Sequence, residues 1–351
     1  MIIKEQWDLL NEHLQECVDK GVFPGASFAI VTPTEARITH VGNRQNVPSV
    51  IPNDENTIWD LASITKVFAT TSCILKLMEQ GKLTLKTKVC EVLPEFSQKE
   101  LTILHCITHT SGLPADITGY KNMTKDQMLD FVKNVQCEKV PGTEVMYSDI
   151  NFILLGQIIE TLTGSFKDYA TENLFKPLNM LNTGFNPESS PIDNFAAYED
   201  IQERGGIIKG VVHDGKAFKL GGVSGHAGVF STINDLSHFV YMLLNDGVYF
   251  GRRIFSPSTI DLLKKCQTSK LNEKRSIGWV LSDPNYSLGD FYSEHTLFHT
   301  GFSGCSLLID LDRHVGFICT CNRVHPSRSN TKIFQERNNI HNLAYQCFKN
   351  N

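Results

Sequence analysis

The residues Ser63-Ile64-Thr65-Lys66 place a hydroxyl and an amine three positions apart, at the start of a segment with helical apolar spacing. On a helix, positions i and i+3 lie on one face, with their Cβ atoms about 5–6 Å apart. A lysine that close can remove the proton of a serine hydroxyl if its own pKa is lowered. The tetrad therefore predicts a serine nucleophile that works without histidine. An N-capping Ser63 beside a solvated Lys66 is the alternative interpretation.

The protonation state of Lys66 decides its role. A free lysine has a pKa near 10.4 and is a poor base. Burial lowers that pKa, whereas a neighbouring carboxylate raises it. Ser63 would sit at the positive end of the helix dipole, which favours an oxyanion nearby.

Two further segments could contribute chemistry. In Tyr147-Ser148-Asp149, a tyrosine precedes an expected helix with Asp149 as a possible cap. A phenol beside a lysine ammonium loses its proton more easily and can act as a base. In His299-Thr300-Gly301, the glycine would let a substrate lie along a strand edge, and the next backbone N–H could donate to an oxyanion. Taken alone, Tyr147 is an ordinary half-buried tyrosine and the third segment is a weak signal.

The order and spacing of these three segments resemble the serine β-lactamase and penicillin-binding protein superfamily. The resemblance is to its class C-like branch, which includes D-alanyl-D-alanine carboxypeptidases and esterases, and it covers most of the chain. It extends to His109-Thr110-Ser111-Gly112-Leu113-Pro114, Leu154-Leu155-Gly156, Gly225-His226-Ala227-Gly228-Val229-Phe230-Ser231-Thr232 before Asp235-Leu236, Phe302-Ser303-Gly304 and Asn322-Arg323-Val324-His325-Pro326.

The resemblance implies that Ser63 is the acylated nucleophile and that Lys66 and Tyr147 handle the protons. It implies an oxyanion hole made by the backbone amides of Ser63 and Phe302, and no cofactor. The residues that it assigns to substrate binding are Asp149, His299, Thr300, Gly301 and Phe302.

Two positions depart from the pattern of the family's lactamases. Asp149 stands where they have asparagine, and an ionised carboxylate only accepts hydrogen bonds. It could also hold Lys66 in its charged form, so we expect Tyr147 to be the base beside a positive Lys66. His299 stands in place of lysine and is mostly neutral above about pH 6.5. Recognition of a substrate carboxylate should therefore weaken, which argues against an efficient lactamase without excluding a peptidase.

Strand-like runs lie near both ends of the chain. We expect hairpins at 26–31 with 36–41 and at 306–309 with 315–320, and helices at 5–20 and 332–348. The middle favours helices at 65–80, 99–109, 125–135 and 151–162.

This pattern predicts an α/β (α+β) fold with an antiparallel sheet flanked by helices and a helical insertion, and the resemblance implies that the fold is of the β-lactamase/transpeptidase type. The sheet domain should comprise residues 1–75 and 211–351, and the mainly helical domain residues 76–210. The active site is expected in the cleft between them.

Composition limits the classes of partner. The net charge is −5 and no basic block occurs, so no nucleic-acid partner is expected. No run of 18 apolar residues occurs, so no membrane span is expected. The ten scattered cysteines and the absence of a signal-peptide pattern favour a reduced, cytoplasmic protein. A trimmed N-terminus of an exported protein would instead place it outside the cytoplasm.

Other candidate sites have ordinary explanations. His105 and His109 have metal-ligand spacing on a helix, but Cys106 stands where a zinc protease has glutamate. Cys319 and Cys321 would share one face of a strand as buried thiols. The glycine-rich stretch 221–228 lacks the ending of a phosphate loop and is interpreted as a tight turn. We expect no metal site, and no role is assigned to His213, Asp214 or His226.

The expected function is acyl transfer to water through an acyl-Ser63 intermediate, on esters or amides of small acyl compounds. One alternative is a D-alanyl-D-alanine carboxypeptidase or weak β-lactamase of cell-wall metabolism. Another, from a different class, is a penicillin- or peptide-binding protein without turnover. The partner is a small-molecule or peptide-like acyl substrate in each case, and the oligomeric state is left open.

Overall fold

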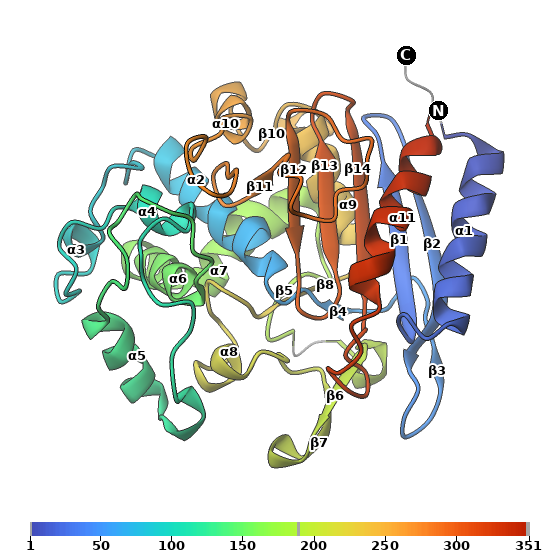
Figure 1. Ribbon diagram of the computed structural model, residues 1–351, viewed down its shortest axis with the longest axis horizontal. Coiled ribbons are helices and arrows are strands. Elements are labelled where there is room, and N and C mark those ends of the chain that lie inside the picture. The colour runs from blue at the N-terminus through green and yellow to red at the C-terminus, as the bar shows by residue number, and fades with distance from the viewer. Residues whose placement is uncertain (1, 188–189, 349–351) are drawn as a thin grey trace.

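A seven-stranded antiparallel sheet is assembled from both ends of the chain in the computed structural model, which describes residues 2–187 and 190–348 (Figure 1). The strand order is β11-β12-β13-β14-β1-β2-β3. The strands are β1 (Gly25–Val31), β2 (Ala36–Gln45), β3 (Ile51–Pro52), β11 (Val280–Leu281), β12 (Thr296–Thr300), β13 (Ser306–Asp310) and β14 (Val315–Cys321). The two predicted hairpins, β1–β2 and β13–β14, are confirmed, and β1 pairs with β14 at the centre.

The central strands are buried on both faces. Successive side chains of a strand point to opposite faces. In β1, Phe28 and Ile30 therefore enter one core cluster while Ala29 and Val31 enter the other. Cys319 and Cys321 are two apart in β14 and are both buried in the first of these clusters, as predicted. All ten cysteines carry free thiols.

The terminal helices cover one face of the sheet together (Figure 1). Helix α1 (Lys4–Asp19) buries Leu10, Leu14 and Cys17, which recur at helical spacing on one side. It packs against α11 (Ile333–Gln346), and both lie over the cluster that contains Phe28. These helices agree with the predicted ranges 5–20 and 332–348.

The helix-rich part of the chain lies beyond the opposite face. Helix α9 (Ile233–Leu244) packs against β14 and β1. Helix α2 (Thr71–Glu79) runs between the sheet and the remaining helices (Figure 1). These are α3 (Val89–Val92), α4 (Ile103–Ile107), α5 (Lys125–Asn134), α6 (Asp149–Thr163), α7 (Phe166–Ala170), α8 (Gly215–Lys219) and α10 (Pro257–Leu263), with short turns η1 (Lys66–Thr70), η2 (Tyr120–Asn122), η3 (Thr171–Phe175), η4 (Lys176–Leu178), η5 (Ile192–Asn194) and η6 (Gln202–Arg204).

The predicted helix at 99–109 is shorter in the structure. Thr102 caps α4 by accepting from the backbone N–H of His105, so the helix starts only at Ile103. His109 has a left-handed backbone with φ of 58°, which is incompatible with helix continuation. The predicted helix at 99–109 is therefore reduced to the single short helix α4, Ile103–Ile107.

Three small sheets lie outside the seven-stranded sheet in the described part of the chain. One joins β4 (Trp59–Asp60), β8 (Val229–Ser231) and β5 (Gly184–Phe185), and two hairpins consist of β6 (Ala197–Ile201) with β7 (Gly206–Lys209) and β9 (Val248–Tyr249) with β10 (Arg252–Arg253). Strands β5, β6 and β7 lie in the region predicted to be mainly helical. No described helix is both long and apolar enough to cross a membrane.

Candidate active site

A tight turn between β4 and η1 presents Ser63. Ala62 has a left-handed backbone with φ of 47°, which is strained for a residue with a Cβ. Its N–H donates to the buried Asp60 carboxylate at 2.8 Å, and this bond holds the turn. Lys66 begins η1, a π-helical turn that continues into α2. The half-buried Ser63 is therefore fixed at a helix start, as the sequence predicted.

The ammonium of Lys66 faces Ser63. Lys66 Nζ lies 3.0 Å from Ser63 Oγ, and the lysine side chain is fully buried. The same nitrogen donates to the backbone oxygen of His226 at 3.0 Å and contacts Asp149 Oδ1 at 2.7 Å. The ammonium therefore donates to two oxygens and forms an ion pair with a third.

Lys66 remains charged because the opposing electrostatic effects are unequal. Burial lowers the pKa of Lys66, but the charges of Asp149 and Tyr147 and their hydrogen bonds outweigh burial and raise it. At neutral pH, Lys66 is therefore a cation beside the serine and not a free base.

The loop before α6 places Tyr147 over this ammonium. Its ring centroid lies 4.9 Å from Lys66 Nζ, within the range of a cation–π contact. The buried Ser148 fixes the loop, since its hydroxyl donates to Pro114 O at 2.5 Å and its N–H donates to His109 Nδ1 at 3.1 Å. Tyr147 itself is 37% exposed, so one side of the ring faces solvent.

Asp149 is shared between two lysines. Its Oδ1 contacts Lys66, and its Oδ2 lies 3.1 Å from the Nζ of Lys216, a nearly buried residue of α8. Burial raises the pKa of Asp149, but the charges of Lys66, His226 and Lys216 prevail and lower it to about 2. Asp149 is thus a permanent anion whose charge is divided between the nucleophile's lysine and a second cation.

A network of ion pairs extends from Asp149 along α8. Lys216 Nζ also lies 2.9 Å from Asp116 and 3.8 Å from Asp214, so three carboxylates surround one ammonium. Asp214 in turn accepts from His226 Nε2 at 2.8 Å. His226 therefore contributes through its backbone oxygen to Lys66 and through its ring to Asp214.

Asp149, Asp214 and His226 offer ligand atoms within 4.8 Å of one another, a spacing that could suit a cation. Two lysine ammonium groups already contact Asp149, and His226 already pairs with Asp214. These contacts satisfy the carboxylates as ion pairs, so the donor set does not fit a metal ion well. His105 and His109 do not converge, because His105 caps its own helix and His109 lies beneath Tyr147.

The third predicted segment ends β12 beside the nucleophile's turn. His299 is buried, and its ring centroid lies 6.1 Å from that of Tyr147. Burial, assisted by the charges of Arg275 and Lys66, holds the pKa of His299 well below its usual range. Its Nδ1–H donates to the oxygen of Thr300 at 2.9 Å, which leaves Nε2 as an acceptor.

Residues 301–303 pack against the segment before Ser63. A Cβ on Gly301 would lie 2.5 Å from the backbone oxygen of Leu61, so the close approach requires glycine. Ser303 Oγ donates to Asp60 O at 3.0 Å. The adjacent Phe302 is 47% exposed and stacks on His213 with a centroid separation of 5.8 Å. The structure therefore brings every predicted site residue to one locality.

Three neighbours of the site were not singled out as functional in the sequence: Lys216, Arg275 and His109. Lys216 lies far along the chain from Asp149, and Arg275 lies far from Tyr147, so no local spacing could place either of them at the site. His109 was considered as a metal ligand and as part of a segment that carries the family resemblance, but it was given no catalytic role. His213, Asp214 and His226 had no assigned role, and the latter two belong to the ion-pair network.

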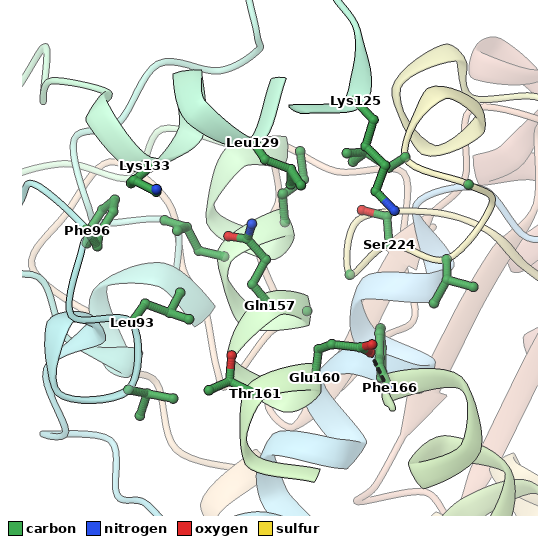
Figure 2. A pocket seen from close by; sticks show the side chains of 18 of the residues that line it. Leu93, Phe96, Lys125, Leu129, Lys133, Gln157, Glu160, Thr161, Phe166 and Ser224 are labelled. Atoms are coloured by element: carbon green, nitrogen blue, oxygen red, sulfur yellow. Dashed lines mark hydrogen bonds between the residues drawn. The ribbon is translucent and has the colours of Figure 1, made fainter. Parts of the chain in front are cut away.

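A separate pocket of 850 Å³ lies on the other side of α6. Figure 2 shows Lys125 reaching toward Ser224, and Glu160 beside Phe166. Glu160 accepts from the backbone N–H of Phe166, and Lys133 forms an ion pair with Glu95. The charged groups of Glu160 and Lys133 therefore already have partners within the protein. Its lining lacks Ser63, Lys66 and Tyr147, and we assign the chemistry to the Ser63 site.

Comparisons with known proteins point in the same direction. The Beta-lactamase family matches residues 10–340. A putative D-alanyl-D-alanine carboxypeptidase of Escherichia coli K12 is 32% identical over 77% of this chain and 70% of its own length. An N-acetylmuramyl-L-alanine amidase of Bacillus subtilis is 32% identical over 77% of this chain and 68% of its own.

Solved structures share the fold at lower identity. EstCE1, a hydrolase with promiscuous acyltransferase activity, has a TM-score of 0.75 at 20% identity, covering 96% of this chain and 98% of its own. A penicillin-binding protein homologue from Pyrococcus abyssi has a TM-score of 0.73 at 22% identity. The match covers 93% of this chain and 76% of the homologue's chain.

Proposed function

Because this chain belongs to the beta-lactamase family of serine hydrolases, we propose that it hydrolyses esters or amides of small acyl compounds through an acyl-Ser63 intermediate. The observation that supports this most directly is the 3.0 Å contact between Ser63 Oγ and the buried ammonium of Lys66. The contact positions the hydroxyl, and the adjacent phenol supplies a group that can take its proton.

In the proposed reaction, Tyr147 starts as the phenolate, and Ser63 Oγ bonds to the acyl carbon as its proton passes to the phenolate oxygen. The tetrahedral oxyanion is held by the backbone amides of Ser63 and Phe302. The bond to the leaving group then breaks, and Tyr147 returns the proton to that group. Water repeats the sequence on the acyl-enzyme, releasing the acid and restoring Ser63. Loss of one oxyanion donor typically costs about 10²–10³ in rate.

The neutral His299 supports a preference for substrates without a carboxylate at this subsite. It is buried and keeps an unprotonated Nε2, so it offers no positive charge to an anion. Lys66 and Lys216 are already paired with carboxylates.

A second candidate is favoured by the names of the relatives. A D-alanyl-D-alanine carboxypeptidase and an N-acetylmuramyl-L-alanine amidase both cleave amide bonds of cell-wall components, and each is 32% identical to this chain. The corresponding function here would be hydrolysis of a peptidoglycan amide by the same Ser63 chemistry.

Three substrates separate these candidates: a p-nitrophenyl ester, an acyl-D-alanyl-D-alanine peptide and a fluorescent penicillin. The first proposal expects rapid ester turnover with slow penicillin labelling. Rapid labelling of Ser63 by the penicillin with no ester hydrolysis would contradict it and favour the second candidate.

A fluorophosphonate that reacts with activated serines tests the shared chemistry. The unmutated protein should be labelled, and Ser63→Ala should not. Tyr147→Phe should slow labelling by about 10²–10⁴-fold, the usual contribution of a general base. An unlabelled but folded protein would instead support a binding protein without turnover.

A further inference from the structure

Arg275 is a buried guanidinium close to the reacting groups. Only 1% of the residue is exposed, although an arginine is charged at any ordinary pH. Its Nη2 donates to Tyr286 OH at 3.1 Å, and its Nε forms an ion pair with Glu273. Its Nη1 is buried without a hydrogen-bond partner among the described residues. Burial of a partly unsatisfied cation is costly, so this position needs an explanation.

The guanidinium lies beside Tyr147. Its Cζ is 5.7 Å from the centroid of the Tyr147 ring, compared with 4.9 Å for Lys66 Nζ. Two cations therefore approach one phenol from two different parts of the chain, η1 and the segment before β11.

The other ring neighbours of Tyr147 do not add charge. The centroid of His109 lies 4.5 Å from that of Tyr147, and the centroid of His299 lies 6.1 Å away. Burial, followed by the charge of Arg275, holds the pKa of each histidine well below its usual range. Among the described residues, the charged or titratable groups that face Tyr147 or its two cations include Lys66, Arg275, His109, His299, Asp149, Glu273 and Tyr286.

We propose that Arg275 is a positioning residue that stabilises the deprotonated phenol of Tyr147 as a second fixed cation. Lys66 is shared with Asp149 and Ser63, so its charge is partly neutralised where it meets the ring. Arg275 supplies a second positive charge beside the ring, and it adds to the effect of burial, which is the main reason that the two neighbouring histidines stay uncharged. This inference rests on the proposed function, in which Tyr147 accepts the proton of Ser63.

The test measures the second-order rate constant of fluorophosphonate labelling of Ser63 from pH 5 to 10. The plot of this rate constant against pH should rise from an acidic limb as Tyr147 loses its proton. Removing the charge with Arg275→Met should move the midpoint of that limb to higher pH by about one unit, so labelling below the midpoint slows about tenfold. Arg275→Lys keeps a charge and should recover most of that shift. Glu273→Gln removes the counter-charge and should move the limb to lower pH. Tyr286→Phe removes a hydrogen bond but no charge and should leave the midpoint in place.

A purely structural role predicts a different pattern. Arg275→Met would then slow labelling by the same factor at every pH and leave the midpoint of the acidic limb unchanged. This result would overturn the inference. A shift of Glu273→Gln in the same direction as Arg275→Met would overturn it as well. If Arg275→Met does not fold, Glu273→Gln still decides. An unlabelled unmutated protein contradicts the proposed function and this inference with it, whereas normal labelling with unmoved limbs contradicts the inference alone.

Discussion

The Nζ atom of Lys66 and the Oδ1 atom of Asp149 lie 2.7 Å apart, with the lysine fully buried. The pair fixes the protonation states of both partners, because burial alone would favour neutral forms. Each is instead held charged by the other, and the lysine cannot serve as a neutral base at pH 7. The proton of Ser63 therefore needs another acceptor, and Tyr147 is the adjacent candidate.

Asp149→Asn should move the basic limb of the kcat/KM profile to lower pH. The carboxylate raises the pKa of Lys66, so its removal lets the ammonium lose its proton at a lower pH, and the phenol then loses its cation. A pH series with a p-nitrophenyl ester measures the limb. Asp116→Asn is the matched control, since Asp116 contacts Lys216 and not Lys66. An unchanged basic limb in Asp149→Asn would remove the reason to assign the base to Tyr147.

His299→Lys should improve substrates that carry a free carboxylate. A charge-assisted hydrogen bond contributes about 1.5–3 kcal/mol, so the preference for a carboxylate over its methyl ester should rise at least about tenfold at pH 8. The new lysine would be buried near Lys66 and Arg275, so the melting temperature should fall. The neutral variant His299→Gln is the control. An equal preference in both variants would show that position 299 does not select against carboxylates.

The sheet and the terminal helices could be predicted because their patterns are local. Short strand-like runs at 26–31, 36–41, 306–309 and 315–320, with turn residues between the members of each pair, predict β1, β2, β13 and β14. The apolar spacing of residues 99–109 predicts a longer helix than is found, because Thr102 caps the helix late and the backbone conformation of His109 prevents it from continuing. Such boundaries depend on capping and on backbone conformation, to which apolar spacing is insensitive.

Some residues of the candidate site could be predicted from local spacing, whereas others are brought together only by the tertiary fold. Ser63 and Lys66 are three residues apart, so a helical turn alone brings them together. Asp149 and Lys216 meet only because α6 and α8 are placed by the tertiary fold. The sequence indicated that Asp149 would hold Lys66 charged, but not that a second lysine shares the carboxylate. Arg275 likewise reaches Tyr147 through tertiary packing, with no motif to mark it.

Lys216→Met should destabilise the protein by about 1.5–3 kcal/mol at pH 7, since it leaves the half-buried Asp149 and Asp214 without the cation that they share. Asp149 and Asp214 have lowered pKa values and stay charged at that pH. These carboxylates take up protons more readily once Lys216 is gone, so the loss of stability should be smaller at low pH than at pH 7. Urea unfolding at pH 7 and pH 4 measures both effects. The exposed Lys121 provides the control in Lys121→Met, and a deficit that is equal at both pH values would contradict the ion-pair explanation.

Gly225→Ala should destabilise the protein and slow the reaction of Ser63 together. A Cβ at position 225 would lie 1.9 Å from the backbone oxygen of Phe152 in α6, so the helix and the loop must separate. The next residue, His226, provides the backbone oxygen that accepts from Lys66, so the shift reaches the nucleophile's lysine. We expect a loss of about 1–3 kcal/mol by urea unfolding and slower fluorophosphonate labelling of the variant that remains folded. Gly184→Ala is the matched control, because a Cβ at position 184 meets no atom within 4 Å and should change stability by no more than about 0.5 kcal/mol. Equal stability and labelling of the two variants would show that this close approach does not position Lys66.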